Sequence, residues 1–125
     1  NYCALLSIEA LTLLDMVRRD VLPAVSDYSA ELCDRAAKKK GVPCRYETTL
    51  AADMAEKVDA LLAAADQLEA DLGRCGGELE EKMHYFHDTV AADMAKIREL
   101  ADALETVTAK EYWPYPSYSD ILFYM

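Results

Sequence analysis

The apolar positions of this chain recur at steps of three and four along three long stretches, which is the spacing that buries one face of a helix. The three stripes are Leu14, Val17, Val21, Val25, Tyr28, Leu32; Met54, Val58, Leu61, Ala65, Leu68, Leu72; and Leu79, Met83, Phe86, Val90, Ile97, Leu104, Val107. Every glycine lies in the two short segments between these stretches. The pattern predicts an all-α chain, an antiparallel three-helix bundle whose helices span about residues 4–40, 48–72 and 78–109.

Pro23 lies inside the first predicted helix. A proline there removes one backbone hydrogen bond and clashes with the preceding turn. Because the apolar stripe keeps its register across Pro23, we expect one long helix kinked at this residue rather than two helices joined by a loop.

Helix ends are marked by charge, glycine and threonine. Four cations, Arg35, Lys38, Lys39 and Lys40, precede Gly41, and they favour the negative end of a helix dipole. A cationic helix end is the simpler interpretation, and an anion or acidic-partner site is the alternative. Thr48 or Thr49 is expected to cap the second helix.

The last stretch, residues 110–125, differs from the helices before it. It holds two prolines and most of the aromatic residues of the chain; proline forces an extended path, and large aromatic side chains seek burial. The pattern predicts an extended aromatic tail packed across the helices, with one helical turn begun by Ser117 and Asp120. The residues given structural roles are Pro23, Trp113, Pro114, Pro116, Tyr118, Leu122 and Phe123.

Length and charge narrow the class of protein. The 125 residues are enough for a single helical domain over 1–125, and the net charge of −10 argues against nucleic acid or an anionic membrane as a partner. No apolar run is long enough for a membrane span, and no signal peptide is recognised. The four cysteines have no metal-binding or disulfide spacing, so we expect reduced thiols in the cytoplasm. The chain begins at Asn1, and we expect it to be a fragment of a longer one.

The residues offer one candidate constellation for chemistry. Glu81, His84 and Asp88 share a helix face at a spacing found in di-iron carboxylate bundles. Such a site needs two Glu-x-x-His motifs, and this chain has one, so a polar helix face is the preferred interpretation. We assign no catalytic, cofactor-binding or metal-binding residue to the chain.

Two segments carry a resemblance to a known family. Residues 111–123, with the sequence EYWPYPSYSDILF, and residues 16–25, with the sequence MVRRDVLPAV, resemble the C-terminal domain of type III glutamine synthetases. The resemblance implies a parent enzyme that joins ammonia to glutamate with ATP and divalent Mg or Mn, in a large oligomer. It places the catalytic machinery upstream and implies that this piece packs on the catalytic region and neighbouring subunits without ligase activity of its own.

A different class of function remains open from the residues. The second helix carries six acidic residues against one lysine on its polar faces: Asp53, Glu56, Asp59, Asp66, Glu69 and Asp71 against Lys57. The alternative is therefore a free-standing helical adaptor whose acidic face binds a basic protein.

Overall fold

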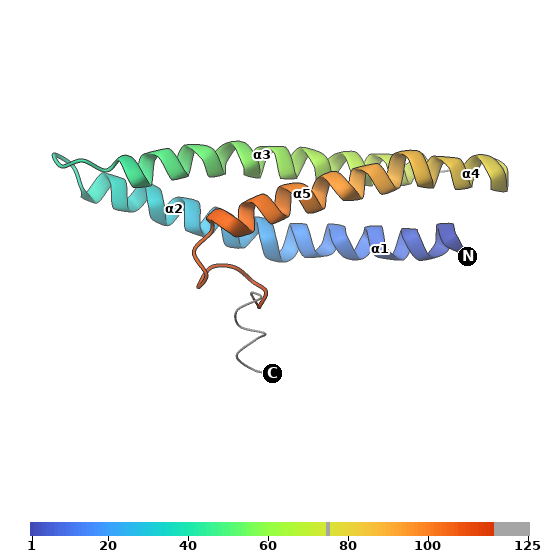
Figure 1. Cartoon of the computed structure of the whole chain (residues 1–125), viewed down its shortest axis with the longest axis horizontal. Helices are drawn as coiled ribbons and strands as arrows, with labels where there is room; N and C mark the ends of the chain where they lie inside the picture. The colour runs from blue at the N-terminus through green and yellow to red at the C-terminus, as the bar shows by residue number, and fades with distance from the viewer. Residues whose placement is uncertain (75, 117–125) are drawn as a thin grey trace.

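The computed structural model describes residues 1–74 and 76–116 (Figure 1). Its elements are α1 (Tyr2–Met16), η1 (Val17–Val21), α2 (Leu22–Lys38), α3 (Arg45–Gly73), α4 (Leu79–Tyr85), η2 (Phe86–Val90) and α5 (Ala91–Val107). Both η elements are π-helical turns. The predicted all-α class is confirmed, since the described residues hold no strand. In that same part of the chain, no helix combines the length and the apolar character needed to cross a membrane.

The seven elements form three long helical rods. Figure 1 shows the first rod, α1 to α2, running from the N-terminus to the turn at Gly41, α3 returning beside it, and α4 to α5 running back along α3. Gly41 has a φ of +90°, a conformation that glycine adopts without the steric cost of a Cβ atom. α3 contacts α1, α2 and α5.

The first rod changes direction without breaking, as Figure 1 shows where α1 gives way to α2. The cause lies at η1, where the Leu22 N–H donates to the carbonyl of Val17, five residues back. Pro23 follows immediately, and the wider π turn relieves the clash between its ring and the preceding turn. The helix stays continuous across an exposed Pro23.

The second π turn, η2, was not predicted, and it corrects the third apolar stripe. A π turn holds one extra residue, so it rotates everything before it by about 100° relative to the helix after it. Phe86, Val90, Ile97 and Leu104 are buried, but Leu79 and Met83 are 63% and 45% exposed. In their place, Lys82 and Tyr85 are the half-buried residues of α4. The expectation that Leu79 and Met83 belong to the core was wrong.

The start of α3 corrects a second expectation. The helix begins at Arg45 with Cys44 before it, so neither Thr48 nor Thr49 is its cap. Thr48 lies within the first turns and donates its hydroxyl back to the carbonyl of Cys44 at 3.2 Å. Glu47, which is buried, instead accepts a 2.7 Å hydrogen bond from Lys39 at the end of the first rod. This bond lowers the pKa of Glu47 and joins the two helix ends around the Gly41 turn.

Candidate functional site

Two carboxyl groups face each other between α3 and α5, and they are the most unusual polar feature of the described residues. Asp71, near the end of α3, is 5% exposed. Its Oδ1 accepts a hydrogen bond from the Gln67 side chain at 3.0 Å and lies 3.8 Å from a guanidinium nitrogen of Arg74. The Tyr85 hydroxyl donates to the main-chain carbonyl of Asp71 at 2.7 Å. These contacts fix Asp71 firmly at the interface.

Asp93, at the start of α5, is the other member of the carboxyl pair. Burial, together with the hydrogen bond and negative charge of Asp71, raises the pKa of Asp93 to about 7. Its Oδ2 is buried, and no hydrogen bond from the described residues reaches it. The hydrogen bond from Asp93 lowers the pKa of Asp71, with Gln67 contributing in the same direction. Below about pH 7 the carboxyl pair therefore holds one proton, mainly on Asp93.

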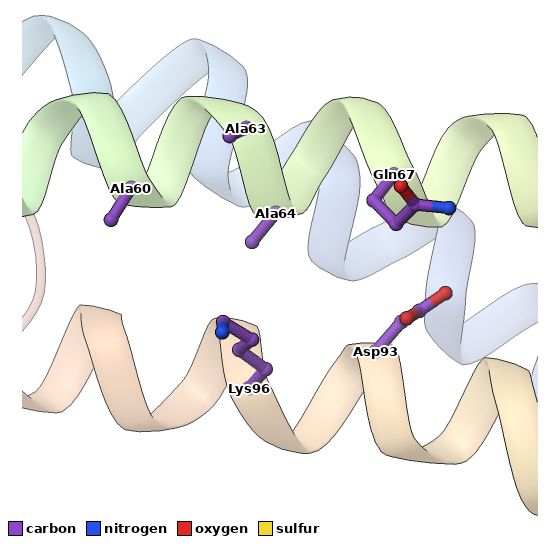
Figure 2. A pocket seen from close by; sticks show the side chains of 6 residues that line it. All are labelled: Ala60, Ala63, Ala64, Gln67, Asp93 and Lys96. Carbon is purple, nitrogen blue, oxygen red and sulfur yellow. The ribbon is translucent and has the colours of Figure 1, made fainter.

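A cavity of about 310 Å³ adjoins this carboxyl pair. Figure 2 shows Ala60 and Ala64 of α3 on one side, with Lys96 and Asp93 of α5 opposite and Gln67 across from Asp93. The space exists because small alanine side chains line α3 at this point. The arrangement can hold and exchange a proton. No three His, Cys, Asp or Glu side chains lie together as a metal would need within residues 1–74 and 76–116.

The carboxyl pair makes a prediction for pH dependence. Because the folded-state pKa of Asp93 is raised, its contribution to stability is full below about pH 4 and is lost as the pH rises through about 7. Asp93→Asn cannot ionise, so we expect it to be more stable than the parent chain by about 1 kcal/mol at pH 8, a value reduced by solvent access to the cavity. Urea unfolding at pH 5 and pH 8 measures the difference.

The matched control for this prediction is Asp59→Asn, since Asp59 lies exposed on α3. It should keep the parent pH dependence between pH 5 and pH 8. The lowered pKa of Asp71 acts in another window, because its contribution is lost only as the pH falls below about 4. The shared proton would be contradicted if the difference in stability between Asp93→Asn and the parent chain were the same at pH 5 and at pH 8.

The first part of the aromatic tail lies against the first rod. The rings of Tyr112 and Tyr28 are 5.0 Å apart, and the Tyr115 hydroxyl donates to Asp20 at 2.8 Å. Burial, then this hydrogen bond, raises the pKa of Tyr115 to about 12. Trp113 is half-buried against the core with its ring edge-on to Tyr115, while Pro114 and Pro116 are exposed. Tyr118, Leu122, Phe123 and the helical turn expected from Ser117 lie outside the described residues.

Several of the other charged groups singled out in the sequence are engaged in ion pairs. Arg35 pairs with Glu31, Lys38 with Asp34 and Lys39 with Glu47, so three of the four cations at the end of α2 are engaged within the chain. Arg18 bridges Asp66 and Glu69, which links the first rod to the acidic face of α3.

Among the described residues, the side chains of Glu81, His84 and Asp88 are not gathered into a group that could hold a metal ion. The three side chains are exposed, and Asp88 lies 2.9 Å from its neighbour His87 rather than from His84. The preferred interpretation, a polar helix face, agrees with their exposure.

Comparison with known proteins identifies relatives of this chain. The family model described as glutamine synthetase C-terminal domain matches residues 1–40, which is the whole first rod. A glutamine synthetase of Butyrivibrio fibrisolvens is 30% identical over 129 residues, covering 98% of this chain and 18% of that protein. The first rod is thus similar to the C-terminal domain of glutamine synthetases, and nearly the whole chain is similar to part of a glutamine synthetase. This confirms the resemblance predicted from the first helix and the aromatic tail.

A second relative supports the resemblance to the type III subclass of glutamine synthetases. The type-3 glutamine synthetase of Dictyostelium discoideum is 25% identical over 128 residues, covering 94% of this chain and 17% of that protein. The chain thus spans less than a fifth of the length of these glutamine synthetases. No solved structure matches it.

Proposed function

We propose that these residues form a non-catalytic C-terminal helical domain of a type III glutamine synthetase, folded as an antiparallel three-helix bundle with the aromatic tail packed on it. One observation carries the proposal: two glutamine synthetases align with nearly all of this chain while using less than a fifth of their own length. Several polar groups of the described residues join one helix to another, as those of Arg18, Lys39 and Tyr85 do.

The proposed parent protein is a cytoplasmic oligomer that ligates ammonia to glutamate with ATP and Mg or Mn. In this account ATP, metal and glutamate bind outside residues 1–125. The domain supports the folding and assembly of the catalytic region and of neighbouring subunits through side-chain packing. The carboxyl pair of Asp71 and Asp93 tunes the stability of the domain with pH.

The reading frame upstream of Asn1 tests this function against the adaptor alternative. We expect it to continue, without a start codon immediately before Asn1, into several hundred residues related to glutamine synthetase. A start codon directly before Asn1 would contradict the proposal and favour a free-standing acidic adaptor. The acidic face of α3 is then the surface to test with basic proteins, although Arg18 already pairs with part of it.

A further inference from the structure

The outward side of α1 is apolar, although the opposite side of the same helix already contributes residues to the core. Cys3, Ala10 and Leu14 point inward and are buried, while Leu5, Ile8 and Leu11 are 62%, 63% and 60% exposed. Residues three apart lie about 60° from one another around a helix, so these three form a continuous ridge. Glu9 is the only charged residue between Asn1 and Leu14. A helix that is apolar on all sides is typical of one that is buried on all sides.

α4 contacts α1 and also carries exposed apolar side chains, those of Leu79 and Met83. A groove of about 380 Å³ runs between them, lined by Tyr2 and Met83 together with Glu80, His84 and His87. On the other flank of the ridge, Leu11 borders a groove of about 570 Å³ toward the end of α3. We define the α1–α4 apolar face as the exposed residues Tyr2, Leu5, Ile8, Leu11, Leu79 and Met83.

The π turn at η2 explains why α4 contributes to this face. A regular helix would continue the buried stripe through Leu79 and Met83, whereas the extra residue of η2 leaves both side chains exposed on α4. Single exposed apolar side chains are ordinary on a protein surface, whereas a contiguous set with grooves on both flanks marks an interaction surface. The two helices therefore present one apolar surface to a partner.

We propose that the rest of the same glutamine synthetase chain covers the α1–α4 apolar face, an inference that rests on the proposed function. The relatives devote more than four-fifths of their length to residues outside the aligned region. In the proposed function that remainder precedes this domain, so α1 is the described helix nearest to it in the sequence. The occupant is an apolar surface of the catalytic region, seated at the point where the two parts of the chain meet.

Charge favours the catalytic region of the same chain over two other possible partners of this face. A basic protein would seek the acidic face of α3, since the α1 ridge offers it only Glu9. A second copy of this domain would bring together two chains of charge −10, which repel each other at close range. An apolar surface of the same chain encounters neither difficulty, and its covalent link gives it a high effective concentration.

Photocrosslinking of the full-length chain tests this inference. A benzoylphenylalanine is placed at position 8, in the centre of the ridge, in a preparation already shown to make glutamine. We expect a product of monomer mass in which peptide mapping joins position 8 to a segment preceding residue 1. The matched control carries the same group at position 62, since Leu62 is a 46% exposed leucine on α3, and it should yield at least five-fold less of that product.

Three results would overturn the inference. They are a crosslinked dimer that joins position 8 to another copy, equal yields of the intramolecular product from positions 8 and 62, and no protein crosslink at position 8. Because glutamine formation is established before the crosslink is attempted, each of these results contradicts the docking face and leaves the proposed function standing. A reading frame without an upstream synthetase contradicts the proposed function instead.

Discussion

Phe86→Ala is expected to lower the free energy of unfolding of this chain by about 3–5 kcal/mol, the usual cost of truncating a fully buried phenylalanine. Phe86 is 2% exposed and opens η2, where the helix rotates between α4 and α5. Removing its ring leaves a cavity at the point where the apolar stripe changes face. Urea unfolding followed by circular dichroism measures the loss.

The control for Phe86→Ala is Leu62→Ala, because Leu62 is a large apolar residue exposed on α3. That change should alter the free energy of unfolding by less than about 0.5 kcal/mol. If the two variants unfold at the same urea concentration, the buried position of Phe86 is wrong, and with it the helix rotation at η2.

Trp113→Ala is expected to cost about 2 kcal/mol. The sequence alone predicts a loss of about 3 kcal/mol or more, the value for a fully buried aromatic residue. The smaller figure follows because Trp113 is only half-buried, with one edge against Tyr115 at a ring distance of 6.4 Å. Thermal unfolding measures the change, and Trp113→Phe should recover at least half of it.

An unchanged melting temperature for Trp113→Ala would contradict the packing of the tail on the first rod. It would place the Trp113 ring in an interface with another part of the parent protein. Comparison with Tyr115→Phe, which removes only the hydrogen bond to Asp20, separates loss of packing from loss of that bond.

The first rod could be predicted from the sequence because each of its features has a local cause. Its apolar stripe from Leu14 to Leu32 is buried throughout. Pro23 predicts a change in the helix geometry, which the structure accommodates as a π turn. The second π turn has no proline near it, and the residues at its two ends, Phe86 and Val90, are buried in the core. If the π turn is not foreseen, regular helical spacing assigns Leu79 and Met83 to the buried face of the helix.

The carboxyl pair was missed for a related reason. The sequence places the acids of α3 on the polar faces of the helix, and Asp71 belongs to that set. A signal was present, since Asp71 follows Leu68 by three residues and Asp93 follows Val90 by three, which places both at the edge of an apolar stripe. Their encounter depends on how α3 and α5 are aligned, and the sequence of one helix does not determine that alignment.

The central claim is that these residues serve a glutamine synthetase without performing its chemistry. The most direct test is to measure glutamine formation from glutamate, ammonia and ATP by the full-length parent chain and by the 125-residue chain, each with Mg and with Mn. We predict turnover by the full-length chain and none by the 125-residue chain with either metal. Glutamine formation by the 125-residue chain alone would contradict the account.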